Sequence, residues 1–324
     1  PLNMPDDTEG FQRFNAMQIQ WTEMAMLGWS DVARITFVRV GSGIDGEGAY
    51  SNDASILLGN YSSGAKGASA FANFPGNPAS TSTAGDVWVN INASNNSLPA
   101  LGNFGAHVLV HELGHAIGLA HPGDYNADED TTITYAADAE YYEDSRQYTV
   151  MSYFSVVNTG GNYGSHFPAS PQLDDIRAAQ IEYGANMTTR TGDTVYGFNS
   201  NAQRPWFEAA NSSSRLVFAV WDAGGDDTFD FSRYSENQLI DLREGFFSNV
   251  GALVGNVAVA QGAKIENAIG GFGGDTMNGN ALANRLEGEG GADRIFGGAG
   301  DDTIDGGSGV GYLRGDEGND TILG

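Results

Sequence analysis

Residues 270–324 read GGFGGDTMN GNALANRLE GEGGADRIF GGAGDDTID GGSGVGYLR GDEGNDTIL G, which is six units of nine residues and a last glycine. The first position is Gly in all six units, the fourth is Gly in five with Leu282 as the exception, and the eighth is always apolar. Glycines adopt backbone conformations that side chains forbid, and the apolar residue turns one side chain inward from each short strand. A flexible linker has no such period, so the pattern predicts a parallel β-roll of calcium-binding nonapeptides.

The sixth position of each unit predicts where calcium binds, because Ca²⁺ prefers carboxylate and carbonyl oxygens as ligands. If one turn of the coil takes two units, sixth positions eighteen residues apart lie on the same side. One column then holds Asp275 and Asp293, and the other holds Asn284, Asp302 and Asp320. Gly311 brings no carboxylate to the first column, so we expect weak calcium binding or none beside it.

The rest of the chain divides into two parts. Up to about residue 185 it reads as mixed α and β: a helix over 11–28, a strand over 33–40, a strand over 86–91, and helices over 104–119 and 174–183. Phe11, Phe14, Met17, Trp21, Met24 and Gly28 would form one face of the first helix. Strand-like stretches at 215–220 and 256–260 lead into the repeats. We therefore expect an α+β domain over residues 1–187 and an all-β domain over 188–324.

Four of the five histidines lie between positions 107 and 121, and they include the run HELGHAIGLAH at 111–121. His111 and His115 are four residues apart and share one face of a helix, so both imidazoles can hold one ion. Gly118 can adopt the left-handed conformation that ends the helix and returns His121 as a third ligand. Three neutral ligands leave a position open for water, which predicts a catalytic zinc site.

Glu112 lies beside the first ligand, where its carboxylate can reach a zinc-bound water without binding the metal. Zinc lowers the pKa of that water toward about 7, and Glu112 can take its proton as the hydroxide attacks a carbonyl carbon. The same acid can then protonate the leaving nitrogen. His107 lies one turn further back and the ligand set is already complete, so we expect a structural role for it. His166 is expected in a loop.

These residues resemble the metzincin metallopeptidases, and the repeats narrow the resemblance to the serralysin family. HPGDYN at 121–126 follows the zinc motif as in serralysins, and TVMSY at 149–153 is similar to their Met-turn. The resemblance implies a mixed-sheet metzincin domain in which Met151 forms an apolar floor beneath the zinc. It also implies that Tyr153 approaches the metal and stabilises the oxyanion during catalysis. LDDI at 173–176 is similar to the start of the last catalytic-domain helix, although Asp174 and Asp175 could simply favour a helix N-terminus.

The resemblance also implies calcium ligands before the main repeats. A first site comprises Arg190, Gly192, Thr194, Asp222, Gly224, Gly225 and Asp227, and the next comprises Glu266, Gly271, Gly273 and Asp275. From the residues alone, the loop that begins at Asp222 is either a calcium loop or an acidic turn. In the repeats, the predicted ligands are Asn284, Gly288, Gly290, Asp293, Gly297, Gly298, Gly300, Asp302, Gly315, Gly318 and Asp320.

Composition limits the class of partner. Lys and Arg number 15 against 41 Asp and Glu, a net charge of −26, which argues against nucleic acid and anionic membranes and suits cations. No cysteine is present, which excludes disulfides and thiol catalysis, and no apolar run approaches 18 residues. Residues 1–10 do not resemble a signal peptide.

We therefore expect a monomeric secreted endopeptidase with one zinc and several calcium ions that hydrolyses proteins or peptides. The strand over 86–91 is either the exposed edge along which a substrate lies or an interior strand. By resemblance, a type I exporter secretes the protein, and a segment after the repeats, which we expect to be missing here, could retain it at the cell surface. The alternatives are a calcium-dependent surface or matrix protein whose zinc domain only binds, and a zinc hydrolase of non-peptide substrates.

Overall fold

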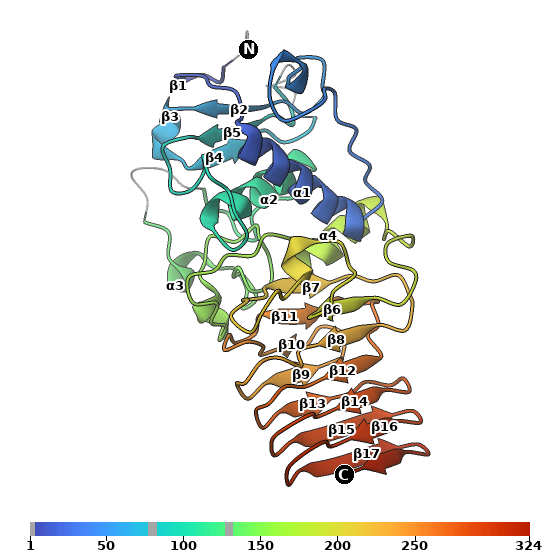
Figure 1. Ribbon diagram of the computed structural model, residues 1–324. Coiled ribbons are helices and arrows are strands. Elements are labelled where there is room, and N and C mark those ends of the chain that lie inside the picture. Colours follow the sequence, from blue (N-terminus) through green and yellow to red (C-terminus); the bar gives the residue numbers. More distant parts are fainter. Residues whose placement is uncertain (1–3, 77–82, 127–131) are drawn as a thin grey trace.

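The computed structural model describes residues 4–76, 83–126 and 132–324, and Figure 1 shows a helical part above a coil of short strands. The first helix, α1, spans Ala16–Val32 and begins at Asn15, whose side chain accepts a hydrogen bond from the Gln18 amide in a capping box. The helix was predicted to begin too early. Phe11 precedes it, and Met17 is 39% exposed, because the buried face carries Ile19, Ala25 and Trp29 instead.

A small sheet lies beside the helices in the order β2 (Leu58–Tyr61), β5 (Val87–Asn90), β4 (Ala70–Ala72). The predicted strand over 86–91 is therefore β5, and it lies inside this sheet, parallel to β2 and antiparallel to β4. The edge-strand interpretation of it is wrong, since both of its edges are paired. The strand predicted over 33–40 is also wrong: Ala33 makes an isolated bridge to Ala185, and Val38 is 81% exposed.

Helix α2 (Phe104–Ala116) carries the zinc motif, and α4 (Leu173–Tyr183) is the predicted last helix. Asn103 starts α2 by accepting a hydrogen bond from the Ala106 amide. Gly118 ends it with φ +103°, a conformation that favours glycine, as the motif predicts. The remaining short elements of this part are β1 (Thr8–Glu9), β3 (Ser63–Gly64), α3 (Tyr135–Asp138) and 3₁₀ turns at Glu47–Ala49, Ala65–Gly67 and Val156–Thr159.

The second part is a roll of two parallel ladders. One is β6 (Val195–Gly197), β8 (Thr228–Asp230), β12 (Asn267–Ile269), β14 (Arg285–Glu287), β16 (Thr303–Asp305) and β18 (Thr321–Leu323). The other is β9 (Leu239–Asp241), β13 (Thr276–Asn278), β15 (Arg294–Ala299) and β17 (Tyr312–Glu317). A third sheet, β10 (Phe247–Ser248), β11 (Val257–Val259) and β7 (Phe218–Val220), and a 3₁₀ turn at Pro205–Phe207 complete it.

The repeats have the predicted geometry of two units per turn, since Thr276 pairs with Arg294 and Arg285 with Thr303. The eighth-position side chains Met277, Leu286, Ile295 and Ile304 are fully buried. Ile322 is 46% exposed because β18 has no following turn against it among the described residues. The roll begins earlier than the repeats, because β6, β8 and β9 already belong to the two ladders.

Buried ion pairs join the two parts of the chain. Asp31 at the end of α1 accepts hydrogen bonds from Arg190, at 2.9 Å, and from Arg204, at 2.8 and 2.9 Å. Asn162 and Val254 exchange backbone hydrogen bonds, and the Tyr163 hydroxyl donates to the Gly255 carbonyl. The roll therefore packs on α1 and on the segment that follows the Met-turn. None of the described helices is both long and apolar enough to cross a bilayer.

Candidate metal centre

The structure brings His111, His115 and His121 together although the third lies beyond the end of α2. Their ligating nitrogens lie within 4.8 Å of one another. The Nε2 atom of His121 is 3.0 Å from that of His115 and 3.3 Å from that of His111. Nitrogens bound to one tetrahedral Zn²⁺ at about 2.0–2.1 Å lie roughly 3.3 Å apart, so this donor set fits zinc.

The other ring nitrogen of each histidine is held by a backbone carbonyl. His111 Nδ1 is 2.8 Å from the Val150 oxygen, His115 Nδ1 is 2.7 Å from that of Leu119, and His121 Nδ1 is 2.8 Å from that of Tyr125. A carbonyl can only accept, so each Nδ1 carries the hydrogen and each Nε2 keeps its lone pair for a metal. Burial lowers the pKa of all three rings, that of His115 to about 4, so the rings are neutral at pH 7.

Glu112 is buried beside this cluster and lines the same cavity of about 220 Å³ as the three histidines and Tyr153. Burial raises the pKa of its carboxyl to about 8. Its Oε2 atom has no hydrogen-bond partner among the described residues. A buried carboxyl oxygen without a partner is costly, and a bound cation with its water would compensate that cost and lower the pKa again.

Met151 lies against α2 at Gly114, which stands between His111 and His115 in the sequence. A Cβ atom on Gly114 would come within 2.5 Å of the Met151 sulfur and 3.1 Å of Trp29, so only glycine fits there. Met151 is 2% exposed. The Met-turn methionine thus supports α2 through an apolar contact at Gly114.

Asp175 joins the Met-turn to α4. Its carboxylate accepts hydrogen bonds from the Val150 amide at 2.7 Å, the Gln172 amide at 2.8 Å and the Thr149 hydroxyl at 2.6 Å. The Val150 carbonyl in turn holds His111. Asp175 therefore does more than favour the helix N-terminus electrostatically, because it holds the Val150 peptide group whose carbonyl holds the His111 ring.

Replacing Asp175 tests this connection. We expect Asp175→Asn to weaken zinc binding by about 10–100-fold, because a group that positions a ligand through a hydrogen bond contributes on that scale. Asp174→Asn is the matched control, since Asp174 is adjacent in α4 but has no side-chain hydrogen bond to the Met-turn among the described residues. Zinc affinity is measured by competition with a chelator. Equal affinities of the two variants would contradict the positioning role.

Aromatic rings surround the open side of the cluster. The Tyr153 ring centre is 4.5 Å from that of His121, and the Tyr125 ring stacks on His121 at 5.3 Å with an interplanar angle of 11°. The buried Asp144 accepts a hydrogen bond from the Tyr125 hydroxyl at 2.8 Å. Arg146 donates to the Tyr153 carbonyl at 2.5 Å. The His121 ring is thus held by a stacked ring as well as by a carbonyl.

His107 is not part of the cluster. Its Nδ1 is 3.1 Å from the Pro168 oxygen, it is buried, and burial lowers its pKa to about 3, which agrees with a structural role. Sequence reasoning missed the three carbonyls, Asp144 and Arg146. Backbone atoms leave no residue signal, and nothing local distinguishes Asp144 or Arg146 from surface charges.

The predicted calcium residues form two connected sets. In the repeats, the backbone amide of a sixth-position residue donates to the carboxylate of the sixth-position acid one turn later. The Asp275 amide donates to Asp293 at 2.8 Å, the Asn284 amide to Asp302 at 2.8 Å, and the Asp302 amide to Asp320 at 3.1 Å. Each acid leans over the first glycine of its own unit, so a Cβ on Gly288 or Gly297 would lie 2.5 or 2.2 Å from a carboxylate oxygen. This contact explains the first glycine of the units whose sixth residue is Asp or Asn, whereas a Cβ on Gly306, whose unit carries Gly311, would lie 2.8 Å from Leu313.

The first predicted site is built from three segments. Asp227 accepts from the Thr194 amide at 2.7 Å, its own amide donates to Glu266 at 3.0 Å, and Gly225 lies against the Gly192 carbonyl. The Arg190 side chain donates to Asp31 at 2.9 Å and to the Trp221 carbonyl at 2.5 Å, and it lies 4.0 Å from the Asp222 carboxylate at the start of the loop. Asp227, Asp293 and Asp302 each have one buried carboxylate oxygen without a hydrogen-bond partner among the described residues. Such oxygens are suited to bind a hard cation such as Ca²⁺.

Comparisons with known protein families identify the kinds of domain in this chain. A model described as metallo-peptidase family M12 matches residues 39–164, and one described as peptidase M10 serralysin C terminal matches residues 185–322. The chain is therefore a metallopeptidase domain followed by a C-terminal serralysin domain of parallel strands.

The relatives narrow this class further, and the chain is a homologue of the serralysins. It is 48% identical over 279 residues to Serralysin B of Dickeya chrysanthemi, and the aligned region covers 84% of this chain and 55% of that relative. It is 49% identical over 283 residues to Metalloprotease AprA of Pseudomonas entomophila, covering 86% and 56%. Serralysin of Photorhabdus luminescens is 44% identical over 290 residues, covering 89% and 57%. The chain thus spans little more than half the length of these relatives.

Proposed function

We propose that this chain is a secreted zinc endopeptidase that hydrolyses peptide bonds in proteins. The observation that carries the proposal is the buried Glu112 carboxyl, with one unpartnered oxygen, in the same cavity as three neutral imidazoles whose Nε2 atoms converge. His111, His115 and His121 would hold the metal. A zinc ion there supplies a water of pKa near 7 and polarises a carbonyl oxygen.

The chain's own residues supply the remaining chemistry. Glu112 takes a proton from the attacking water and returns it to the leaving amine, and burial keeps it away from bulk solvent. Tyr153 faces the same cavity, so its phenol donates a hydrogen bond to the carbonyl oxygen as negative charge develops there. The Nδ1–carbonyl bonds hold the three rings in place during both proton transfers.

The substrate lies along β4 rather than β5. Ala70, Phe71 and Ala72 line the cavity with Glu112, and β4 pairs only with β5 in the described ranges, which leaves its other edge open. An extended peptide can add to that edge through backbone hydrogen bonds, which recognise many sequences alike. We therefore expect broad cleavage of unfolded proteins.

In this proposal, residues 1–187 form the catalytic domain and residues 188–324 form the calcium-binding domain. Bound calcium stabilises the roll of the second domain. Extracellular calcium modules bind at about 10⁻⁴–10⁻³ M, so the roll folds after export by a type I exporter. The rival proposal is a surface or matrix protein with a zinc domain that only binds. The test is hydrolysis of casein by the zinc- and calcium-loaded chain, and retained zinc without hydrolysis of any unfolded protein would support the rival.

A further inference from the structure

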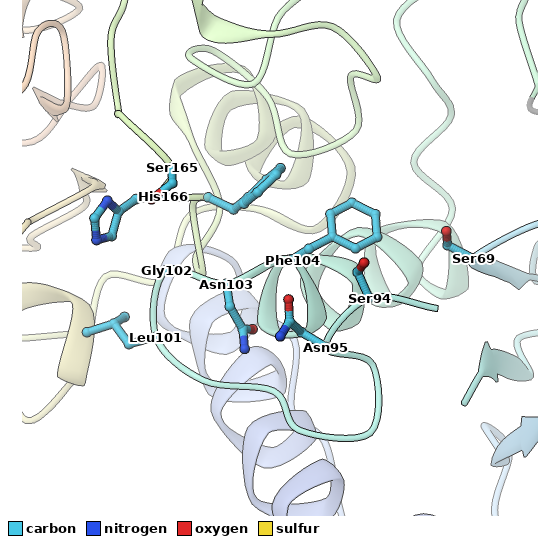
Figure 2. A pocket seen from close by; sticks show the side chains of 10 residues that line it. Ser69, Ser94, Asn95, Leu101, Gly102, Asn103, Phe104, Ser165 and His166 are labelled. Atoms are coloured by element: carbon cyan, nitrogen blue, oxygen red, sulfur yellow. The ribbon is translucent and has the colours of Figure 1, made fainter. Parts of the chain in front are cut away.

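A second and larger cavity, of about 630 Å³, lies at the start of α2 and is not part of the zinc cavity. Figure 2 shows Leu101 and His166 on one side of it and Phe104 and Ser94 on the other, with Ser69 beyond. Its remaining lining residues are Asn95, Gly102, Asn103, Ser165 and Phe167. No acidic residue and no Lys or Arg occurs among these lining residues.

Three groups of residues lie between this cavity and the zinc cavity. Ser69, immediately before β4, lines one cavity, and Ala70, the first residue of β4, lines the other. On α2, the His107 ring lies between them, with ring centres 6.1 Å from Phe104 and 6.3 Å from His111.

Arg146 is the third of these. Its guanidinium donates to the carbonyl of Tyr153, which lines the zinc cavity, and lies 5.4 Å from the ring centre of Phe167, which lines the second cavity. The two cavities therefore follow each other along residues 69–72, the second cavity beside Ser69 and the zinc cavity beside Ala70, Phe71 and Ala72.

The spacing of the two cavities along α2 determines which part of a substrate reaches the second cavity. Phe104 precedes Glu112 by eight residues of α2, which is roughly 12 Å at about 1.5 Å per residue. An extended peptide covers about 3.3 Å per residue, so the cavity receives the third or fourth residue from the scissile bond. Antiparallel pairing with β4 is the more stable arrangement, and it directs the C-terminal side of the substrate toward Ser69.

Phe104, Phe167 and Leu101 supply the apolar part of a lining whose other side chains are polar. The Phe104 and Phe167 rings meet edge to face at 5.4 Å, an arrangement to which a third ring or a branched chain can add. The Phe167 amide donates to the Gly102 carbonyl at 2.9 Å, and a Cβ on Gly102 would lie 2.7 Å from the His166 ring. The two loops that form the cavity are thus locked together.

We infer that this cavity is a specificity subsite for an aromatic or large aliphatic side chain three or four residues after the scissile bond. The inference rests on the proposed peptidase function. Main-chain pairing with β4 would then tolerate many sequences near the cleaved bond, whereas this cavity would select among them at a distance.

The test uses fluorogenic peptides that share one cleavage site and differ only at the third and fourth following positions, where they carry Phe, Leu, Ala or Glu. With the zinc- and calcium-loaded chain, we expect kcat/KM about tenfold higher for Phe or Leu than for Ala, from burial of the side chain. Leu101→Ala and Phe104→Ala should remove most of this preference, measured as the ratio of kcat/KM for the Phe peptide to that for the Ala peptide.

Leu98→Ala is the matched control, since Leu98 is an exposed leucine in the same loop but does not line the cavity. Thermal unfolding establishes that each variant is folded. Equal rates for all peptides, or the same preference in Leu101→Ala and Leu98→Ala, would overturn the subsite while casein hydrolysis persists. Absence of all hydrolysis would instead contradict the peptidase function. In that case anisotropy of labelled Phe and Ala peptides on the zinc-loaded chain decides the subsite, and equal affinities overturn it.

Discussion

Glu112→Gln should lower kcat/KM for casein by about 10³-fold without loss of zinc. General acid and base catalysis contributes about 10²–10⁴-fold, and the amide of glutamine can neither accept the proton of the attacking water nor return it to the amine. The substitution keeps the size of a side chain that is buried beside the three histidines. Hydrolysis is followed with quenched casein, and zinc is quantified by metal analysis of the same samples.

The unchanged zinc content separates this outcome from loss of the metal. His111→Ala provides the comparison, since it removes a ligand and should lose both zinc and activity. His107→Ala removes a neighbouring buried imidazole outside the cluster, so we expect zinc and much of the activity to remain in any fraction that folds. A Glu112→Gln protein with wild-type rates would rule out the carboxylate as the base.

Removal of calcium should unfold the roll, and more readily at pH 8 than at pH 5.5. Burial raises the pKa of Asp275 to about 6 and also raises those of Asp227, Asp293, Asp302 and Glu266. Such a carboxyl holds its proton more tightly when folded than when unfolded, where its pKa is about 4. The calcium-free protein therefore loses stability as the pH rises from about 4 through these folded values, and calcium at neutral pH replaces the protons.

Circular dichroism during calcium titration at the two pH values measures this effect. We expect a midpoint of about 10⁻⁴–10⁻³ M at pH 8 and a smaller change at pH 5.5. Asp302→Asn should shift the midpoint to higher calcium, whereas Asp305→Asn, a nearby acid outside the sixth position, serves as its control. A spectrum that calcium leaves unchanged at both pH values would contradict calcium binding by the repeats.

Sequence reasoning predicted the helices well where a cap or a glycine marks them locally. The helix that carries the zinc motif ends at Ala116, two residues before the left-handed Gly118, and the last helix begins within one residue of the predicted position. It failed at residues 11–15, where apolar residues keep a helical period across the Asn15 cap, and at 33–40, where Ile35 and Phe37 pack against the core while Val38 and Val40 are exposed. Hydrophobic spacing shows which side chains could be buried, and the capping and packing of neighbours decide which ones are.

The sequence by itself determined the two histidines that share a helical face, the glycine that releases the third, and the nine-residue period of the roll. Each is a local relation, since helical and repeat geometry place residues a few positions apart without help from the rest of the chain. The tertiary structure alone decided that Val150, Leu119 and Tyr125 carbonyls hold the rings, that Asp175 holds Val150, and that β4 is the open edge. These contacts join segments far apart in the chain, and the backbone atoms and free strand edges that make them have no residue identity to read.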